Sequence, residues 1–100
     1  MNHMRLLPEF IASIRSGRKH ATIRQGKRRV STGKLQFASN DDAIAVHVHT
    51  VRYTTFAELS NEDAVDDGFD TLADLQNTLR RFYPTIQDQS PITVIEFVPL

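Results

Sequence analysis

The chain contains 100 residues, of which 40% are hydrophobic and 24% are charged, and its formal net charge at pH 7 is zero. That length supports one hydrophobic core, so we expect a single ordered domain over residues 1–100. The chain has no cysteine, which excludes disulfides and thiolate sites. No segment comes near the roughly 20 apolar residues of a membrane span, so we expect a cytoplasmic protein with no membrane partner. We also expect the protein to be a monomer.

The charged residues are sorted into two blocks. A basic block without any acidic residue runs from Arg15 to Lys34, and an acidic block without any basic residue runs from Glu58 to Asp74. In so small a domain the two blocks must lie near each other, which predicts a surface that is cationic on one side and carboxylate-lined on another. Such a surface suits a polar or anionic ligand, although two solvated faces that attract each other weakly fit the same pattern.

The first third of the chain predicts a helix and a strand. Apolar residues at helical spacing over residues 7–14, with a proline in the first turn, indicate a short amphipathic helix that ends before Gly17. Alternation over residues 20–24 then indicates a half-buried strand whose polar face carries Thr22 and Arg24. Residues 25–29 are expected to form an exposed basic loop.

A hairpin and two helices follow. We expect a strand after Gly33, a turn at residues 39–42, and the longest strand of the protein over residues 44–53. A helix should start at Ser60, with Asp63 in its first turn, and end at Gly68.

The last part of the chain predicts a helix over residues 72–82, capped by Asp70 or Thr71, and a strand over residues 92–98 that is buried on both faces. Several strands with too few helices for parallel crossovers indicate an α+β domain. We expect it to be built on a small, curved, partly closed barrel with two or three short helices.

The segment around Lys19 and Thr22 has catalytic potential. A threonine hydroxyl becomes a good nucleophile when a base removes its proton, and a lysine is a base only when its amine is neutral. Arg18, Arg24 and the basic loop, in a partly desolvated cleft, should penalise the charged form of Lys19 and lower its pKa. In a regular strand residues three apart point to opposite faces, so Lys19 must lie in the turn after Gly17 for its side chain to reach Thr22.

These residues belong to a set of motifs that resembles the signature of ASCH domains, small β-barrel proteins related to the PUA fold. The motifs are GRKxxTIR at residues 17–24, TGKL at 32–35, DGF at 67–69, FYP at 82–84 and VIEF at 94–97. They span nearly the whole chain, which is therefore expected to be a single ASCH domain. Its length and the closing VIEF are most similar to the bacterial YqfB-type branch, whose members are amidohydrolases that remove the acetyl group from acetylated cytidine.

The resemblance implies a threonine nucleophile, a lysine general base and a glutamate acid. These roles fall on Thr22, Lys19 and, at the position before Gly68, Asp67. An aspartate is one methylene shorter than the glutamate of the pattern, and aligning the following helix requires a shift of one residue. Asp66 and Asp70 are therefore alternatives for the acid.

The expected reaction needs no metal or cofactor. Neutral Lys19 takes the proton of Thr22, whose oxygen attacks the acetyl carbonyl on the exocyclic nitrogen of cytosine. Asp67 or Lys19 then protonates the departing amine, and water releases acetate from the threonine ester. Arg24 is a candidate for binding the base carbonyl or a sugar oxygen of the nucleoside substrate; pairing with the acidic block is its alternative.

Other functions fit parts of the sequence. An RNA-binding PUA-like module, with or without ribonuclease activity, would use the basic block to bind phosphates, including the loop of Lys27, Arg28 and Arg29.

The side chains of His47 and His49 project from one face of a strand and could chelate a metal ion, but we expect them to be polar surface residues, because no third ligand is evident. Among the aromatic residues, Tyr53 and Tyr83 are candidates for base stacking, whereas Phe10, Phe37, Phe56, Phe82 and Phe97 fit core positions.

Overall fold

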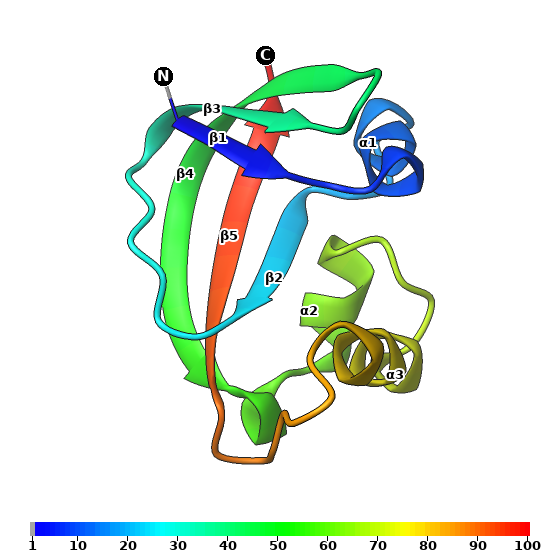
Figure 1. Ribbon diagram of the computed structural model, residues 1–100, viewed down its shortest axis with the longest axis vertical. Helices are drawn as coiled ribbons and strands as arrows, with labels where there is room; N and C mark the ends of the chain where they lie inside the picture. The colour runs from blue at the N-terminus through cyan, green and yellow to red at the C-terminus, as the bar shows by residue number, and fades with distance from the viewer. Residues whose placement is uncertain (1) are drawn as a thin grey trace.

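The computed structural model describes residues 2–100, with side chains from His3 onward (Figure 1). Its elements in chain order are β1 (Asn2–Arg5), α1 (Pro8–Arg15), β2 (Ala21–Gln25), β3 (Gly33–Ala38), β4 (Ala43–Thr55), the 3₁₀ turn η1 (Phe56–Glu58), α2 (Asn61–Asp66), α3 (Leu72–Phe82) and β5 (Pro91–Pro99). The predicted α+β class is confirmed. No helix in this described part of the chain is long and apolar enough to cross a membrane.

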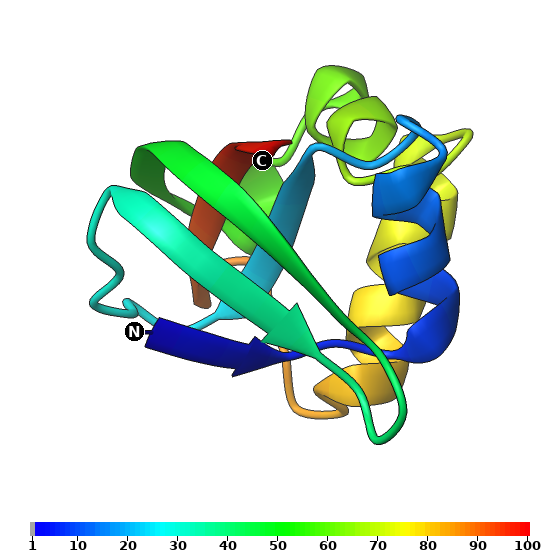
Figure 2. The same ribbon diagram turned by 90° about the horizontal axis from the view of Figure 1, so that it is seen from above.

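The five strands form one curled sheet in the order β1-β3-β4-β5-β2. Strand β1 pairs with β3 in parallel, and all other pairs are antiparallel. Seen from above, the sheet curls into a half-barrel, and the three helices gather on its open side, beside the edge strands β1 and β2 (Figure 2). The predicted partly closed barrel is confirmed in this form.

Strand β5 lies between two halves of the core. Ile95 and Phe97 belong to a cluster with residues of α1, β3 and β4, whereas Ile92 and Val94 pack with residues of β2, α2 and α3. Each of these four side chains is almost completely buried. The prediction of a strand buried on both faces is therefore confirmed, and β5 supports both the β4 side of the sheet and the β2 edge, where the candidate site lies.

The local start signals of the helices act as the sequence predicts. Ser60 and Asp63 form a reciprocal capping box at the start of α2, and Thr71, the second of the two candidate caps, accepts a hydrogen bond from the Asp74 N–H at the start of α3.

Strand β1 was not predicted. Its four residues have no clear apolar alternation, and it forms because its backbone pairs with β3, 33 positions further along the chain at Asn2 and Leu35.

Candidate active site

Lys19 lies in the turn between α1 and β2, as its proposed pairing with Thr22 requires. Gly17 adopts φ +83°, and the backbone N–H groups of Arg18 and Lys19 both donate to the Ser13 carbonyl at 3.1 Å. The backbone thus curls back on α1 and directs the lysine side chain inward, where it is only 3% exposed. Gly68 packs against this turn: a Cβ placed there would lie 3.3 Å from the Lys19 Cβ, so the close approach requires glycine.

Asp67 is the carboxylate that contacts Lys19. It caps the C-terminal end of α2, is 6% exposed, and accepts a hydrogen bond from Lys19 Nζ at Oδ1; its carbonyl oxygen lies 3.4 Å from the same nitrogen. The two alternative acids face other partners. Asp66 Oδ1 lies 3.8 Å from His20 Nδ1, and Asp70 forms an exposed ion pair with Arg18.

These contacts show how the two charge blocks meet. Three consecutive residues of the basic block, Arg18 to His20, face three carboxylates of the acidic block. Only the central pair, Lys19 and Asp67, is buried on both sides. The blocks therefore meet along one seam at the edge of the candidate site, while most of their other charged side chains are exposed to solvent.

Burial brings the pKa values of Lys19 and Asp67 toward each other. Loss of water lowers the pKa of Lys19, opposed by the charge and hydrogen bond of Asp67. Burial also raises the pKa of Asp67 to about 6, although nearby Lys19 acts in the opposite direction. The predicted cause for Lys19 was its cationic neighbours in a partly desolvated cleft. Arg24 does lower its pKa, but burial is the larger cause, and Arg18 is turned toward Asp70.

Thr22 and the Lys19–Asp67 pair line the same cavity. Thr22 lies on β2 opposite Ile95, and although it is only 3% exposed, it forms part of the cavity wall. The cavity has a volume of about 570 Å³, within the range of small-molecule sites. The elements that enclose it are the end of β1, the start of α1, strand β2, the 39–42 turn and helix α3.

One wall of the cavity is aromatic. Phe10 packs edge-on against Phe69 and Phe82 with ring centroids 6.3 Å apart in each case, and Tyr83 completes this wall. The prediction of a core position is wrong for Phe82, which is 46% exposed. Phe10 does pack against the core, and it also lines the cavity. Lys19 Nζ lies 5.3 Å from the centre of the Phe10 ring, so the amine is bordered by an apolar face.

Arg24 lines the cavity on the same strand as Thr22. Its Nη2 donates to the Arg5 carbonyl at 2.6 Å, and burial lowers its pKa. Among the described residues its side chain has no carboxylate partner, so the alternative of pairing with the acidic block is not the arrangement found. The guanidinium is held by a backbone carbonyl and by its place in the wall, beside the space that a ligand would occupy.

The remaining candidates lie outside this cavity. His47 and His49 are exposed on β4, and over residues 2–100 no cluster of three or more potential ligands is placed to hold a metal ion. The loop residues Lys27, Arg28 and Arg29 are exposed. Tyr53 is engaged with this loop: its hydroxyl donates to the Arg28 carbonyl at 2.7 Å, and Lys27 Nζ lies 5.2 Å from its ring centre.

Comparisons with known proteins find similarity in structure rather than in sequence. No family model matches the chain, and no curated protein matches it. Solved structures do match over nearly all of its length. An ASCH domain from Lactobacillus crispatus superposes with a TM-score of 0.78 at 16% identity, covering 98% of this chain and 79% of that one.

Two further solved structures share this fold. The hypothetical protein PH0355 gives a TM-score of 0.75 at 20% identity over 98% of this chain and 97% of that one. A mutant of an ASCH protein from Zymomonas mobilis gives 0.67 at 13% identity over 98% of this chain and 73% of that one. The half-barrel with three short helices is therefore the fold of ASCH-domain structures.

Proposed function

We propose that the protein is a member of the ASCH family and an amidohydrolase that removes the acetyl group from the exocyclic amine of acetylated cytidine. The observation that carries this proposal is the buried Lys19–Asp67 pair, which shares a cavity of small-molecule size with Thr22. The GRKxxTIR motif that contains Lys19 and Thr22 supports the same reaction. The fold shared with ASCH-domain structures is consistent with it.

The first half of the reaction forms a threonine ester. Because burial disfavours both charges, the pair can hold its shared proton on Asp67 and leave the Lys19 amine neutral. Lys19 then takes the proton of the Thr22 hydroxyl, and the oxygen attacks the acetyl carbonyl carbon. The carbon–nitrogen bond breaks, and the exocyclic amine of cytosine leaves with a proton from Asp67 or from the Lys19 ammonium.

The second half restores the enzyme. Water attacks the threonine ester and gives one proton to the Lys19–Asp67 pair, and acetate leaves as Thr22 recovers its hydroxyl proton. Arg24 binds the carbonyl of the base or a sugar oxygen through its guanidinium. The aromatic wall of Phe10, Phe69 and Phe82 provides apolar surface for the planar base.

The test is incubation of the purified protein with acetylated cytidine, with cytidine and acetate followed by chromatography. Thr22→Ala is expected to lose turnover, because no oxygen remains to form the ester, and Thr22→Ser should retain part of it. Thr22→Val is the matched control, since it keeps the branched shape without the hydroxyl and should be as inactive as Thr22→Ala. Full turnover by Thr22→Ala would refute the proposed nucleophile.

A second candidate is an RNA-binding module, with ribonuclease activity as a variant of it. The observation that favours it is the exposed basic loop of Lys27, Arg28 and Arg29, which follows directly from the strand that carries Arg24. In this case Lys19 and Thr22 would contact phosphates instead of breaking an amide.

A further inference from the structure

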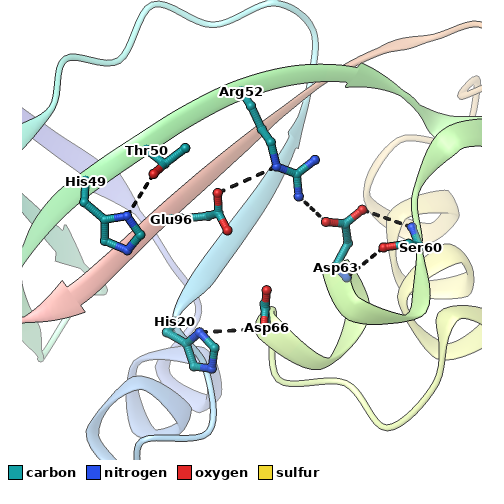
Figure 3. A network of polar contacts seen from close by, with 8 residues as sticks. All are labelled: His20, His49, Thr50, Arg52, Ser60, Asp63, Asp66 and Glu96. Atoms are coloured by element: carbon teal, nitrogen blue, oxygen red, sulfur yellow. Dashed lines mark hydrogen bonds and ion pairs between the residues drawn. The ribbon is translucent and has the colours of Figure 1, made fainter.

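Helix α2 carries Asp67 but is too short to be stable alone. It has six residues, and isolated helices of that length are not stable in water. Its position must therefore come from contacts with the rest of the protein. Ala64 supplies one of them by packing in the core. A network of polar side chains supplies others, and it reaches from the sheet to both ends of the helix (Figure 3).

The N-terminal end of α2 is attached to strand β4 through Asp63. One carboxylate oxygen of Asp63 accepts from the Ser60 N–H at 3.0 Å, which completes the capping box, and the other accepts a hydrogen bond from Arg52 Nη2. Arg52 Nε in turn lies 3.6 Å from Glu96 Oε2 on β5. Figure 3 shows Arg52 between the two carboxylates, one on the sheet and one on the helix.

The C-terminal end of α2 is attached to the segment that carries Lys19. The Asp66 carbonyl accepts from the His20 N–H at 2.8 Å, and the two side chains face each other at 3.8 Å. Inside the helix, the Asp67 N–H donates to the Asp63 carbonyl at 3.0 Å. Asp63 is thus bonded both to Arg52, through its side chain, and to Asp67, through its backbone.

We infer that Arg52 is a positioning residue: through Asp63 and helix α2 it holds the Asp67 carboxyl against Lys19. The inference rests on the proposed function, because it assigns Arg52 to the same reaction. Arg52 is not among the residues that line the cavity, so its effect passes through the helix and not through the substrate. Asp63 is itself buried, and loss of Arg52 would leave its carboxylate without its cationic partner.

The expected consequence of losing Arg52 is a looser α2. Water would then reach the Asp67 carboxyl, and because burial is the main cause of its raised pKa, that pKa should fall toward its ordinary value of 3.8. Displacement of Asp67 from Lys19 should also slow the chemical step, by about tenfold to a hundredfold, with little change in substrate binding.

The experiment compares Arg52→Met and Arg52→Lys with the wild type. Titration of the Asp67 carboxyl carbon by NMR reports its pKa without any substrate, and steady-state kinetics with acetylated cytidine report kcat and KM. We expect Arg52→Met to lower the Asp67 pKa and kcat with KM nearly unchanged, and Arg52→Lys to restore part of both. Arg80→Met is the matched control, because it removes an exposed arginine on α3 and should change neither.

The outcomes separate the inference from the proposed function. An active wild type with an Arg52→Met variant unchanged in Asp67 pKa and kcat overturns the inference alone. An inactive wild type in which Arg52→Met still lowers the Asp67 pKa overturns the amidohydrolase and supports the positioning. If Arg52→Met does not fold, Arg52→Gln, which keeps a hydrogen-bonding side chain without the charge, carries the same test, and an unchanged Asp67 titration in that variant overturns the inference.

Discussion

Lys19 and Asp67 are separated by 48 positions in the sequence, and their side chains meet as a buried ion pair at the wall of the cavity. The backbone around each residue fixes its position. The Lys19 N–H is hydrogen-bonded to the Ser13 carbonyl in the turn after α1, and Asp67 caps the C-terminal end of α2. Burial opposes the charge of both groups, so it lowers the free energy of the neutral pair relative to the ionised pair. A proton can therefore move between them, as the proposed reaction requires.

Asp67→Asn should change how stability depends on pH. In the folded protein the pKa of Asp67 is about 6, above its ordinary value of 3.8, so between these values the folded state holds a proton that the unfolded chain has released. The contribution of this carboxyl to the free energy of unfolding is complete below about pH 4 and is lost as the pH rises through about 6, by at most about 3 kcal/mol. Asp67→Asn removes that loss.

Urea denaturation of both proteins between about pH 4 and pH 7 measures this difference. Relative to the wild type, Asp67→Asn should gain stability as the pH rises. Asp70→Asn is the control, because its exposed pair with Arg18 contributes little and its pH dependence should follow the wild type. A constant difference between Asp67→Asn and the wild type across this range would contradict the raised pKa.

The rate of acetate release should fall on the acid side of about pH 6. Below that value the Lys19–Asp67 pair takes up a second proton, so both groups are protonated and no base remains. We expect kcat/KM to decrease about tenfold per pH unit below this point. A pH profile measured in buffers of constant ionic strength tests this, and a flat profile down to about pH 4 would argue against Lys19 as the base.

Gly68→Ala should destabilise the protein and slow the reaction. Gly68 has φ +91°, and a Cβ there would lie 3.0 Å from Ser13 Oγ and 3.3 Å from the Lys19 Cβ. The strained backbone and the contacts together should cost about 2 kcal/mol, and the turn that carries Lys19 must shift.

Gly33→Ala is the control for this substitution. It has φ +107° but no atom within 4 Å of the added Cβ, so it introduces the backbone strain without the contact. It should lower the free energy of unfolding by about 1 kcal/mol and leave kcat unchanged. Equal losses of activity in Gly33→Ala and Gly68→Ala would show that contact with the Lys19 turn is not the cause.

The dependence on ionic strength distinguishes the two proposed functions, amidohydrolase and RNA-binding module. Hydrolysis of an uncharged nucleoside should respond little to ionic strength, whereas binding through phosphates should weaken steeply. The double substitution Lys27→Ala with Arg29→Ala should leave nucleoside turnover intact and, if the basic loop binds RNA, reduce both RNA affinity and its salt dependence. Kinetics and fluorescence-anisotropy titrations at increasing potassium chloride concentration measure the two responses.

The sequence alone determined those features whose cause is local. Apolar periodicity predicted α1, α3 and β4, because the spacing of buried residues follows directly from helix and strand geometry, and an almost unbroken apolar run predicted β5. The Ser60–Asp63 cap was readable for the same reason, since both partners lie within one turn. The GRKxxTIR segment already carried Lys19 and Thr22 close together, and the turn that it needed is the one found.

Features that depend on residues far apart in the sequence were decided only by the tertiary structure. Three aspartates near Gly68 were candidates for contact with Lys19, and Asp67 makes it because the end of α2 directs its side chain inward while Asp66 and Asp70 face His20 and Arg18. No local signal encodes that choice, because it depends on how α2 is held against the sheet. The largest cause of the Lys19 pKa shift, exclusion of water by the folded chain, is likewise a property of packing and not of neighbouring sequence.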